Sequence, residues 1–234
     1  MRLNGGAREG RLPVLNVAVG CAYAVLVVIH LVACARHAEK LRVVTKPLLM
    51  LMLLAVYLTA DQELIVFVVL ALVLAVIGDT LLLRTQPLWV FFGGLAFLLG
   101  HVMYVCAFAQ DIRFDTLPAA IWLAVLVYLA AGVLVYRAVR AKLGALKGPT
   151  IAYITVLCAM NLAALLRFAS LGTMLALATL IGALIFLVSD FLLLLHEYRR
   201  PLPHADFIIM LTYCLAQSII IASILAAGTN LVVE

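Results

Sequence analysis

Residues 171–195 read LGTMLALATLIGALIFLVSDFLLLL, an apolar run in which Asp190 is the single charged side chain. The hydrocarbon core of a bilayer is about 30 Å thick and takes roughly 20 residues of helix to cross. An apolar run of this length must be helical in lipid, because lipid offers no partner for unpaired backbone groups. The stretch therefore predicts a transmembrane helix that contains one acid.

The composition of the whole chain extends this prediction. The 234 residues are 68% hydrophobic and 12% charged, whereas soluble domains are about half apolar and a quarter charged. These values exclude a water-soluble globule, and they exclude a disordered chain, which would be poor in apolar residues. We expect an all-α, polytopic membrane helix bundle, with residues 1–234 forming one integral membrane domain and residues 1–13 an N-terminal tail.

Hydropathy divides the chain into about eight transmembrane helices joined by short loops. The second is the shortest, which suggests a tilted or partly interfacial segment. The expected spans are 14–35, 46–60, 64–83, 89–108, 117–136, 149–166, 171–195 and 206–226.

The net charge is +5, and the cations lie in loops between apolar runs, where they indicate how the protein is oriented in the membrane. The charge does not indicate nucleic-acid binding, because no nucleic-acid motif is present. Loops 36–46, 84–88, 137–148 and 196–205 lie on one side and carry eleven Lys and Arg residues. The opposite side carries five, namely Arg2, Arg8, Arg11, Arg113 and Arg167. We expect the side with eleven cations to be cytoplasmic.

Two short segments resemble each other. Ile77–Leu83 reads IGDTLLL in the third span, and Val188–Leu194 reads VSDFLLL in the seventh. Spans four apart cross the membrane in the same direction, so a parallel repeat of two four-helix halves would produce this match. Chance similarity between leucine-rich helices is the alternative.

Asp79 and Asp190 are the two acids that lie clearly inside apolar runs. An acid in a spanning helix costs several kcal/mol unless it meets a polar cavity or a partner. Each Asp is expected about one turn inside the end of its helix, near the basic loops. We therefore predict a shared pocket, the alternative being that each acid caps a neighbouring backbone or pairs with an Arg.

Other polar side chains are candidates for the same pocket. Residues three or four apart share a helix face, and so do residues two turns apart, which groups these candidates in pairs within the fourth, eighth and sixth spans. Lys46 precedes Pro47 at the start of the second span, where it reaches either a phosphate or, by snorkelling, the membrane surface. The pairs are His101 with Tyr104, Tyr213 with Gln217, and Tyr153 with Asn161.

Metal and serine chemistry are poorly supported. The chain has no HxxxH or HExxH spacing and no paired Cys, and its five Cys lie in apolar segments. Ser189 adjoins Asp190, but neighbouring helix residues point about 100° apart and no GxSxG elbow occurs. We expect neither a metal nor a cofactor.

Several of these segments together resemble the lysoplasmalogenase (YhhN-like) family of integral membrane hydrolases. The similarity extends from Lys46 to Ser223, and the block from Gly182 to Gln217 is its most specific part. The segments are Lys46-Pro47, Gly78-Asp79, His101-Val102-Met103-Tyr104, Gly182-Ala183-Leu184-Ile185-Phe186, Ser189-Asp190, Pro201-Leu202-Pro203 and Thr212-Tyr213-Cys214-Leu215-Ala216-Gln217.

The resemblance implies an eight-helix membrane hydrolase. We expect a multi-pass protein of a bacterial inner membrane, and the loop charges predict an active site near its cytoplasmic side. Its substrate would be a lysophospholipid among membrane lipids, and nucleic acid would not be a partner. The family cleaves the vinyl ether bond of lysoplasmalogens and releases a fatty aldehyde and a glycerophospho-ethanolamine or -choline. Asp79 and Asp190 would divide acid and base roles, as paired carboxylates do in glycosidases.

The resemblance also implies that His101, Tyr104, Tyr213 and Gln217 would form hydrogen bonds to the carboxylates, the water or the glycerol hydroxyl. Lys46 would meet the phosphate of the head group. The expected substrate-binding residues are Lys46, His101, Tyr104, Tyr153, Asn161, Tyr213 and Gln217.

Three other functions use membrane acids. A proton-coupled transporter of a small molecule or lipid would use Asp79 and Asp190 as proton carriers. Broken helices would favour it, and Gly93-Gly94 and Gly100 in one span are the only such hint. A lipid-binding scaffold would need the acids only for structure. An intramembrane aspartyl protease is disfavoured, because its GxGD motif requires Gly where this chain has Val76.

Overall fold

The computed structural model describes residues 11–230 except residue 62, so most of the predicted 1–13 tail lies outside the described residues. All secondary-structure elements in the described part are helices, which confirms the all-α membrane bundle. The elements are α1 (Arg11–Ala35), α2 (Glu39–Leu58), α3 (Val66–Leu81), α4 (Pro87–Ala109), η1 (Phe114–Thr116), η2 (Ala119–Trp122), α5 (Leu123–Val139), η3 (Gly144–Leu146), α6 (Lys147–Leu171), α7 (Met174–Tyr198) and α8 (Ala205–Asn230).

Seven helices in the described part are long and apolar enough to cross a membrane, and α3 is a shorter apolar helix of 16 residues. The prediction that the second span is the short one is therefore wrong, since α2 has 20 residues. Hydropathy misses the first turns of α2 because Glu39 and Arg42 are charged. These charges are tolerated in a helix because Arg42 pairs with Glu39 at 3.4 Å and with Asp206 of α8 at 2.7 Å.

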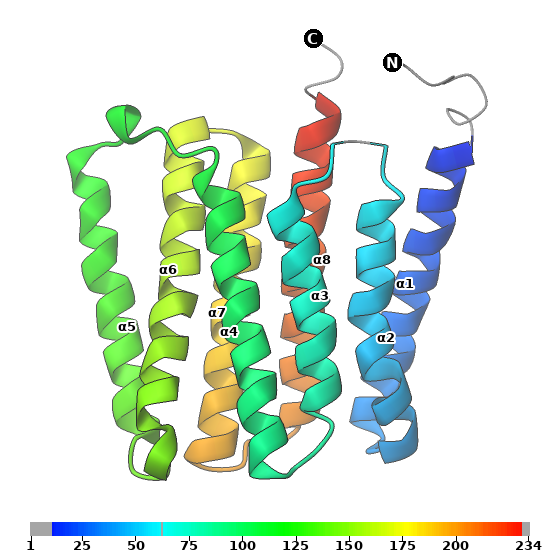
Figure 1. The fold of residues 1–234 in the computed structure, drawn as a ribbon, viewed down its shortest axis with the longest axis vertical. Helices are drawn as coiled ribbons and strands as arrows, with labels where there is room; N and C mark the ends of the chain where they lie inside the picture. Colours follow the sequence, from blue (N-terminus) through cyan, green and yellow to red (C-terminus); the bar gives the residue numbers. More distant parts are fainter. Residues whose placement is uncertain (1–10, 62, 231–234) are drawn as a thin grey trace.

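The helices alternate in direction, so the start of α1 and the end of α8 lie at the same end of the bundle (Figure 1). The connections after α1, α3, α5 and α7 lie at the other end, which is the end with the basic loops. We call it the basic end. Arg2 and Arg8, which entered the orientation count, lie outside the described residues.

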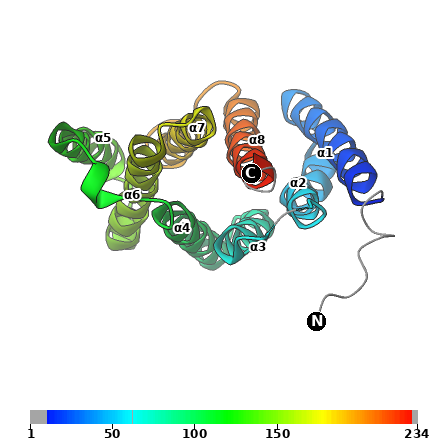
Figure 2. The same ribbon diagram turned by 90° about the horizontal axis from the view of Figure 1, so that it is seen from above.

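Viewed along the bundle, α2, α3, α4, α6, α7 and α8 surround a common centre, while α1 and α5 lie outside them (Figure 2). Each helix of this ring packs on the next, and α4 packs on α6 where α5 is displaced outward. The order α2–α3–α4 is thus matched by α6–α7–α8, each shifted by four helices. This arrangement is what two parallel four-helix halves produce.

Glycines allow two of these helix pairs to approach closely. A Cβ on Gly93 of α4 would lie 2.7 Å from Leu82 Cδ2 and 3.4 Å from the Gly78 carbonyl oxygen. A Cβ on Gly182 of α7 would lie 2.8 Å from Ile220 Cγ1 and 3.1 Å from the Ala216 carbonyl oxygen of α8. Because α4 runs unbroken through Gly93 and Gly94, these residues give no support to a transporter with a broken helix.

Replacing Gly182 by Ala is expected to destabilise the protein, because the added methyl meets the backbone of α8 and the helices must separate. Overpacking of this kind costs about 1–3 kcal/mol. The measurement is the midpoint of thermal unfolding in detergent. Gly20→Ala is the matched control, since a Cβ at Gly20 meets nothing within 4 Å. Equal midpoints for Gly182→Ala and the control would contradict tight packing here.

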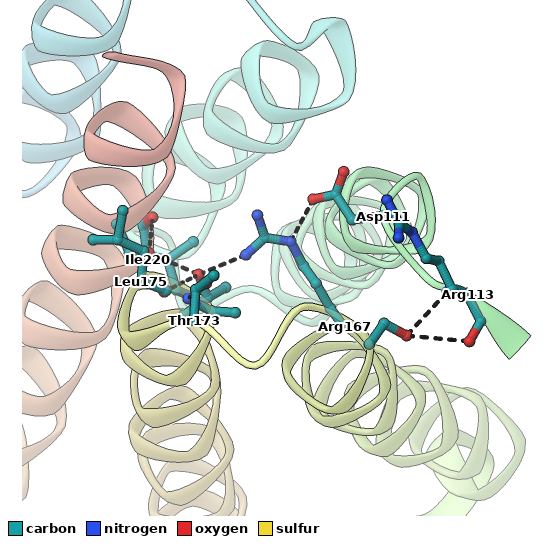
Figure 3. Close-up of polar contacts among 10 residues, drawn as sticks. Asp111, Arg113, Arg167, Thr173, Leu175 and Ile220 are labelled. Carbon is teal, nitrogen blue, oxygen red and sulfur yellow. Dashed lines mark hydrogen bonds and ion pairs between the residues drawn. The ribbon is translucent and has the colours of Figure 1, made fainter. Parts of the chain in front are cut away.

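A polar cluster ties the helices together at the end opposite the basic loops (Figure 3). Arg167 was expected in a loop but lies inside α6 with 7% of its surface exposed. The helix continues to Leu171 and ends at Gly172, whose φ of +63° favours glycine. Arg167 Nε donates to Asp111 Oδ2 at 2.6 Å, and Nη1 donates to Thr179 Oγ1 at 3.1 Å. The Arg thereby joins the end of α4 to α7.

Candidate active site

A cavity of about 640 Å³ opens at the basic end of the bundle. Its volume falls within the range typical of ligand pockets. Side chains from all the ring helices line it, together with His30 of α1, and both Asp79 and Asp190 are among them. We call it the main pocket.

Asp79 lies on α3, two residues before that helix ends at Leu81, and only 1% of its surface is exposed. The hydroxyl of Tyr213 on α8 donates to Asp79 Oδ2 at 3.0 Å. Lys46 Nζ on α2 lies 3.8 Å from Asp79 Oδ1. Both carboxylate oxygens therefore have a protein partner, and one of these partners is a cation.

Asp190 lies on α7 and is 6% exposed. The hydroxyl of Tyr153 on α6 donates to Asp190 Oδ2 at 2.5 Å, and His101 Nε2 on α4 lies 3.4 Å from the same oxygen without the alignment of a hydrogen bond. Among the described residues, no hydrogen bond or ion pair engages Asp190 Oδ1. The second carboxyl group thus keeps one oxygen for a ligand and has no Lys or Arg partner in the part of the chain described.

The partners of the two acids follow the pattern of the two halves. Asp79 on α3 is contacted from α2 and α8, and Asp190 on α7 is contacted from α6 and α4. These helices correspond when the numbering is shifted by four. The chemistry differs, because the partner from α2 is the ammonium of Lys46 and the partner from α6 is the hydroxyl of Tyr153.

An aromatic wall connects the two acids below the main pocket. The Phe186 ring meets His101 edge-on with centroids 4.9 Å apart, and it meets Tyr213 in the same way at 5.5 Å. Phe186 is buried and lies between His101 and Tyr213, which contact Asp190 and Asp79 respectively.

The expectation that both acids lie about one turn inside their helix ends is inaccurate for α7. That helix continues to Tyr198, eight residues beyond Asp190, whereas α3 stops two residues after Asp79. Even so, both acids line one cavity.

Tyr104 and Gln217 lie one layer deeper than the acids. The Tyr104 hydroxyl donates to Gln217 Oε1 at 2.6 Å, and with His101 the two line a separate space of about 10 Å³. Asn161 is buried elsewhere in α6, where its Nδ2 donates to the Leu157 carbonyl at 3.0 Å. Of the predicted binding residues, Lys46, Tyr153 and Tyr213 thus line the main pocket and the other four do not.

Comparison with known proteins gives a direct result for the family. The model of the YhhN family matches residues 41–224, which is most of the chain. The chain belongs to the YhhN family. It is also 33% identical to the human protein "Lysoplasmalogenase TMEM86B" over 155 residues. That match covers 66% of this chain and 62% of the human protein, and no solved structure matches.

The rim of the main pocket in this YhhN protein carries charges that sequence reasoning missed as site residues. Arg42 on α2 and Asp206 on α8 close one side through their 2.7 Å ion pair. Arg84 lies over the Trp89 ring at 4.7 Å on another side. Opposite charges at the ends of two spans were visible in the sequence, but their pairing requires knowing that α2 and α8 are neighbours.

The sequence offers little support for a serine nucleophile or a metal site. Ser189 lines the pocket, but its hydroxyl donates to the Ile209 carbonyl at 3.1 Å, which gives it a structural hydrogen bond between α7 and α8. Within the described residues of the YhhN protein, no group of three or more His, Cys, Asp and Glu side chains is placed to hold a metal ion.

Proposed function

We propose that this protein hydrolyses the vinyl ether bond of a lysoplasmalogen-like lipid by acid–base chemistry of Asp190 and Asp79. The observation that supports it most is the pair of buried carboxyl groups in one cavity with unlike partners. Unlike surroundings allow one carboxyl group to be a neutral acid while the other is ionised. The family and the human relative's name support the same substrate class.

The reaction needs one proton and one water. The acid gives its proton to the outer alkene carbon, and the electrons of the double bond form the new C–H bond. The cation that results is an oxocarbenium ion, to which water adds at the carbon next to oxygen. Loss of a proton gives a hemiacetal, which collapses to a fatty aldehyde and the free hydroxyl of the glycerophospholipid.

Asp190 suits the role of the acid. Its Oδ2 accepts the Tyr153 hydroxyl, while its Oδ1 has no partner in the described residues and lies on a carboxyl group that lines the pocket. A proton on Oδ1 would have no nearby Lys or Arg to oppose it. We therefore assign proton donation to Asp190 Oδ1, with Tyr153 and His101 as positioning residues for the carboxyl group.

Asp79 suits the role of the base. The Lys46 ammonium 3.8 Å away favours the ionised carboxylate. A carboxylate in the pocket orients water by accepting its hydrogen, takes up the proton that water loses, and stabilises the cation beside it. After turnover, the proton must return to Asp190, and the pocket reaches solvent at the basic end for this exchange.

The head group fits the charged side of the pocket. Lys46 and Arg42 both lie on α2 and line the pocket, so they offer cations to a phosphate. We place this end on the cytoplasmic side of a bacterial inner membrane, because it carries the basic loops.

Release of aldehyde from a purified preparation in detergent tests the proposal. Lysoplasmalogen in deuterated water is expected to give an aldehyde with one deuterium on the carbon next to the carbonyl, because the enzyme delivers a solvent-derived proton there. Immediate borohydride reduction fixes the label for mass spectrometry. An acyl lysolipid is the control and should stay intact. Release of fatty acid from the acyl lipid would show that the enzyme is not specific for the vinyl ether, and no aldehyde from any vinyl ether lysolipid would refute vinyl ether hydrolysis.

A further inference from the structure

The two sides of the main pocket differ in polarity. The side formed by α2 and α8 carries Arg42, Lys46 and Asp206, whereas the side formed by the first halves of α4 and α6 is mostly apolar and carries no charged side chain from these two helices. A lysolipid has the same division, with a charged head group and one hydrocarbon chain. The acids lie between the two sides, as the vinyl ether lies between head group and chain.

The apolar side of the pocket extends to the outer surface of α4. Phe91 and Leu95 both line the cavity, and each is also 38% exposed within a helix long enough to span the membrane. Pro149 and Ala152 line the cavity from α6 and are exposed as well. We call this region, between residues 90–98 of α4 and 149–153 of α6, the α4–α6 cleft.

Gly94 is the residue that keeps this cleft wide. It lines the cavity, and a Cβ built on it meets nothing within 4 Å, whereas the neighbouring Gly93 is held against α3 by close packing. Gly94 lies inside a regular helix, where glycine costs roughly 1 kcal/mol relative to Ala. Neither helix packing nor backbone conformation requires glycine at this position. The effect of glycine here is to leave space open in the cleft.

Resting on the proposed function, we propose that the hydrocarbon chain of the substrate lies in the α4–α6 cleft and that Gly94 determines which chains are accepted. The chain enters sideways from the bilayer between the two helices, so that its far end remains among lipid tails. The cleft takes one hydrocarbon chain, and the head group stays at the charged rim. Any side chain larger than glycine at position 94 then competes with the part of the hydrocarbon chain that lies beyond its first eight carbons.

Gly94→Leu tests this assignment. The rate constant kcat/KM is measured for lysoplasmalogens that carry an octenyl or an octadecenyl chain. Loss of about two buried methylene contacts lowers kcat/KM for the long chain by about tenfold relative to the short chain. Gly20→Leu is the matched control, because a Cβ there also meets open space and α1 lies outside the ring. It should leave the ratio unchanged.

A binding measurement separates this proposal from the reaction itself. Alkyl ether lysolipids lack the double bond and cannot be hydrolysed, so their affinity reports the cleft alone. Weaker binding of the octadecyl ether to Gly94→Leu, with the octyl ether unaffected, supports the cleft even if no vinyl ether is cleaved. If Gly94→Leu folds and treats both chain lengths as the wild type does, in turnover and in binding, the chain lies elsewhere.

Discussion

Asp190→Asn is expected to lower aldehyde release from a lysoplasmalogen by about 10²–10⁴-fold, the range that a positioned general acid contributes. Asparagine keeps the shape of the side chain and its place beside Tyr153 and His101, but its amide is far too weak an acid to protonate a carbon. The measurement is single-turnover aldehyde release in detergent. Asp115→Asn, at an exposed position outside the pocket, is the control.

Small carboxylates distinguish the roles of the two acids. Asp79→Ala leaves space for formate, which is ionised at neutral pH and therefore replaces a base. Formate is expected to restore part of the activity of Asp79→Ala but none of that of Asp190→Ala, because an ionised carboxylate has no proton to donate. Rescue of Asp190→Ala alone would reverse the assignment. Full turnover by Asp79→Ala and Asp190→Ala, with normal unfolding midpoints, would refute the two-acid mechanism.

The second large effect concerns stability rather than catalysis. Asp111→Ala is expected to lower the free energy of unfolding by about 3 kcal/mol, because it leaves the guanidinium of Arg167 buried without its charged partner. The Arg167 side chain is 9% exposed, whereas that of Asp111 is 42% exposed. Arg167→Met should therefore cost less, since the Asp111 left behind can be hydrated.

Thermal or denaturant unfolding in detergent measures this asymmetry. The double variant Asp111→Ala with Arg167→Met should be more stable than Asp111→Ala alone, because removing the stranded cation relieves the cost of its burial. An Asp111→Ala protein as stable as the wild type would show that water or the hydrogen bond to Thr179 compensates Arg167 for the loss of its ion pair.

The sequence alone determined the kind of protein and the identity of its two central acids. Hydropathy is a local, additive property, so apolar runs of about 20 residues indicate spans whatever their neighbours are. The same reasoning singled out Asp79 and Asp190, because an acid among apolar residues is costly wherever the helix lies. It failed at charged helix ends such as the first turns of α2, where the stabilising partner of Arg42 is on α8.

Only the tertiary structure decided how these residues combine. Lys46 and Tyr213 meet Asp79 from helices far apart in the sequence, and Tyr153 and His101 meet Asp190 in the same way. No local pattern specifies which helices become neighbours, because lipid tails accept any apolar face and the choice rests on shape, as at Gly93 and Gly182. The same holds for Gly94: its sequence context resembles that of Gly93, and only the positions of α3 and α6 leave Gly94 beside a cavity and Gly93 against a helix.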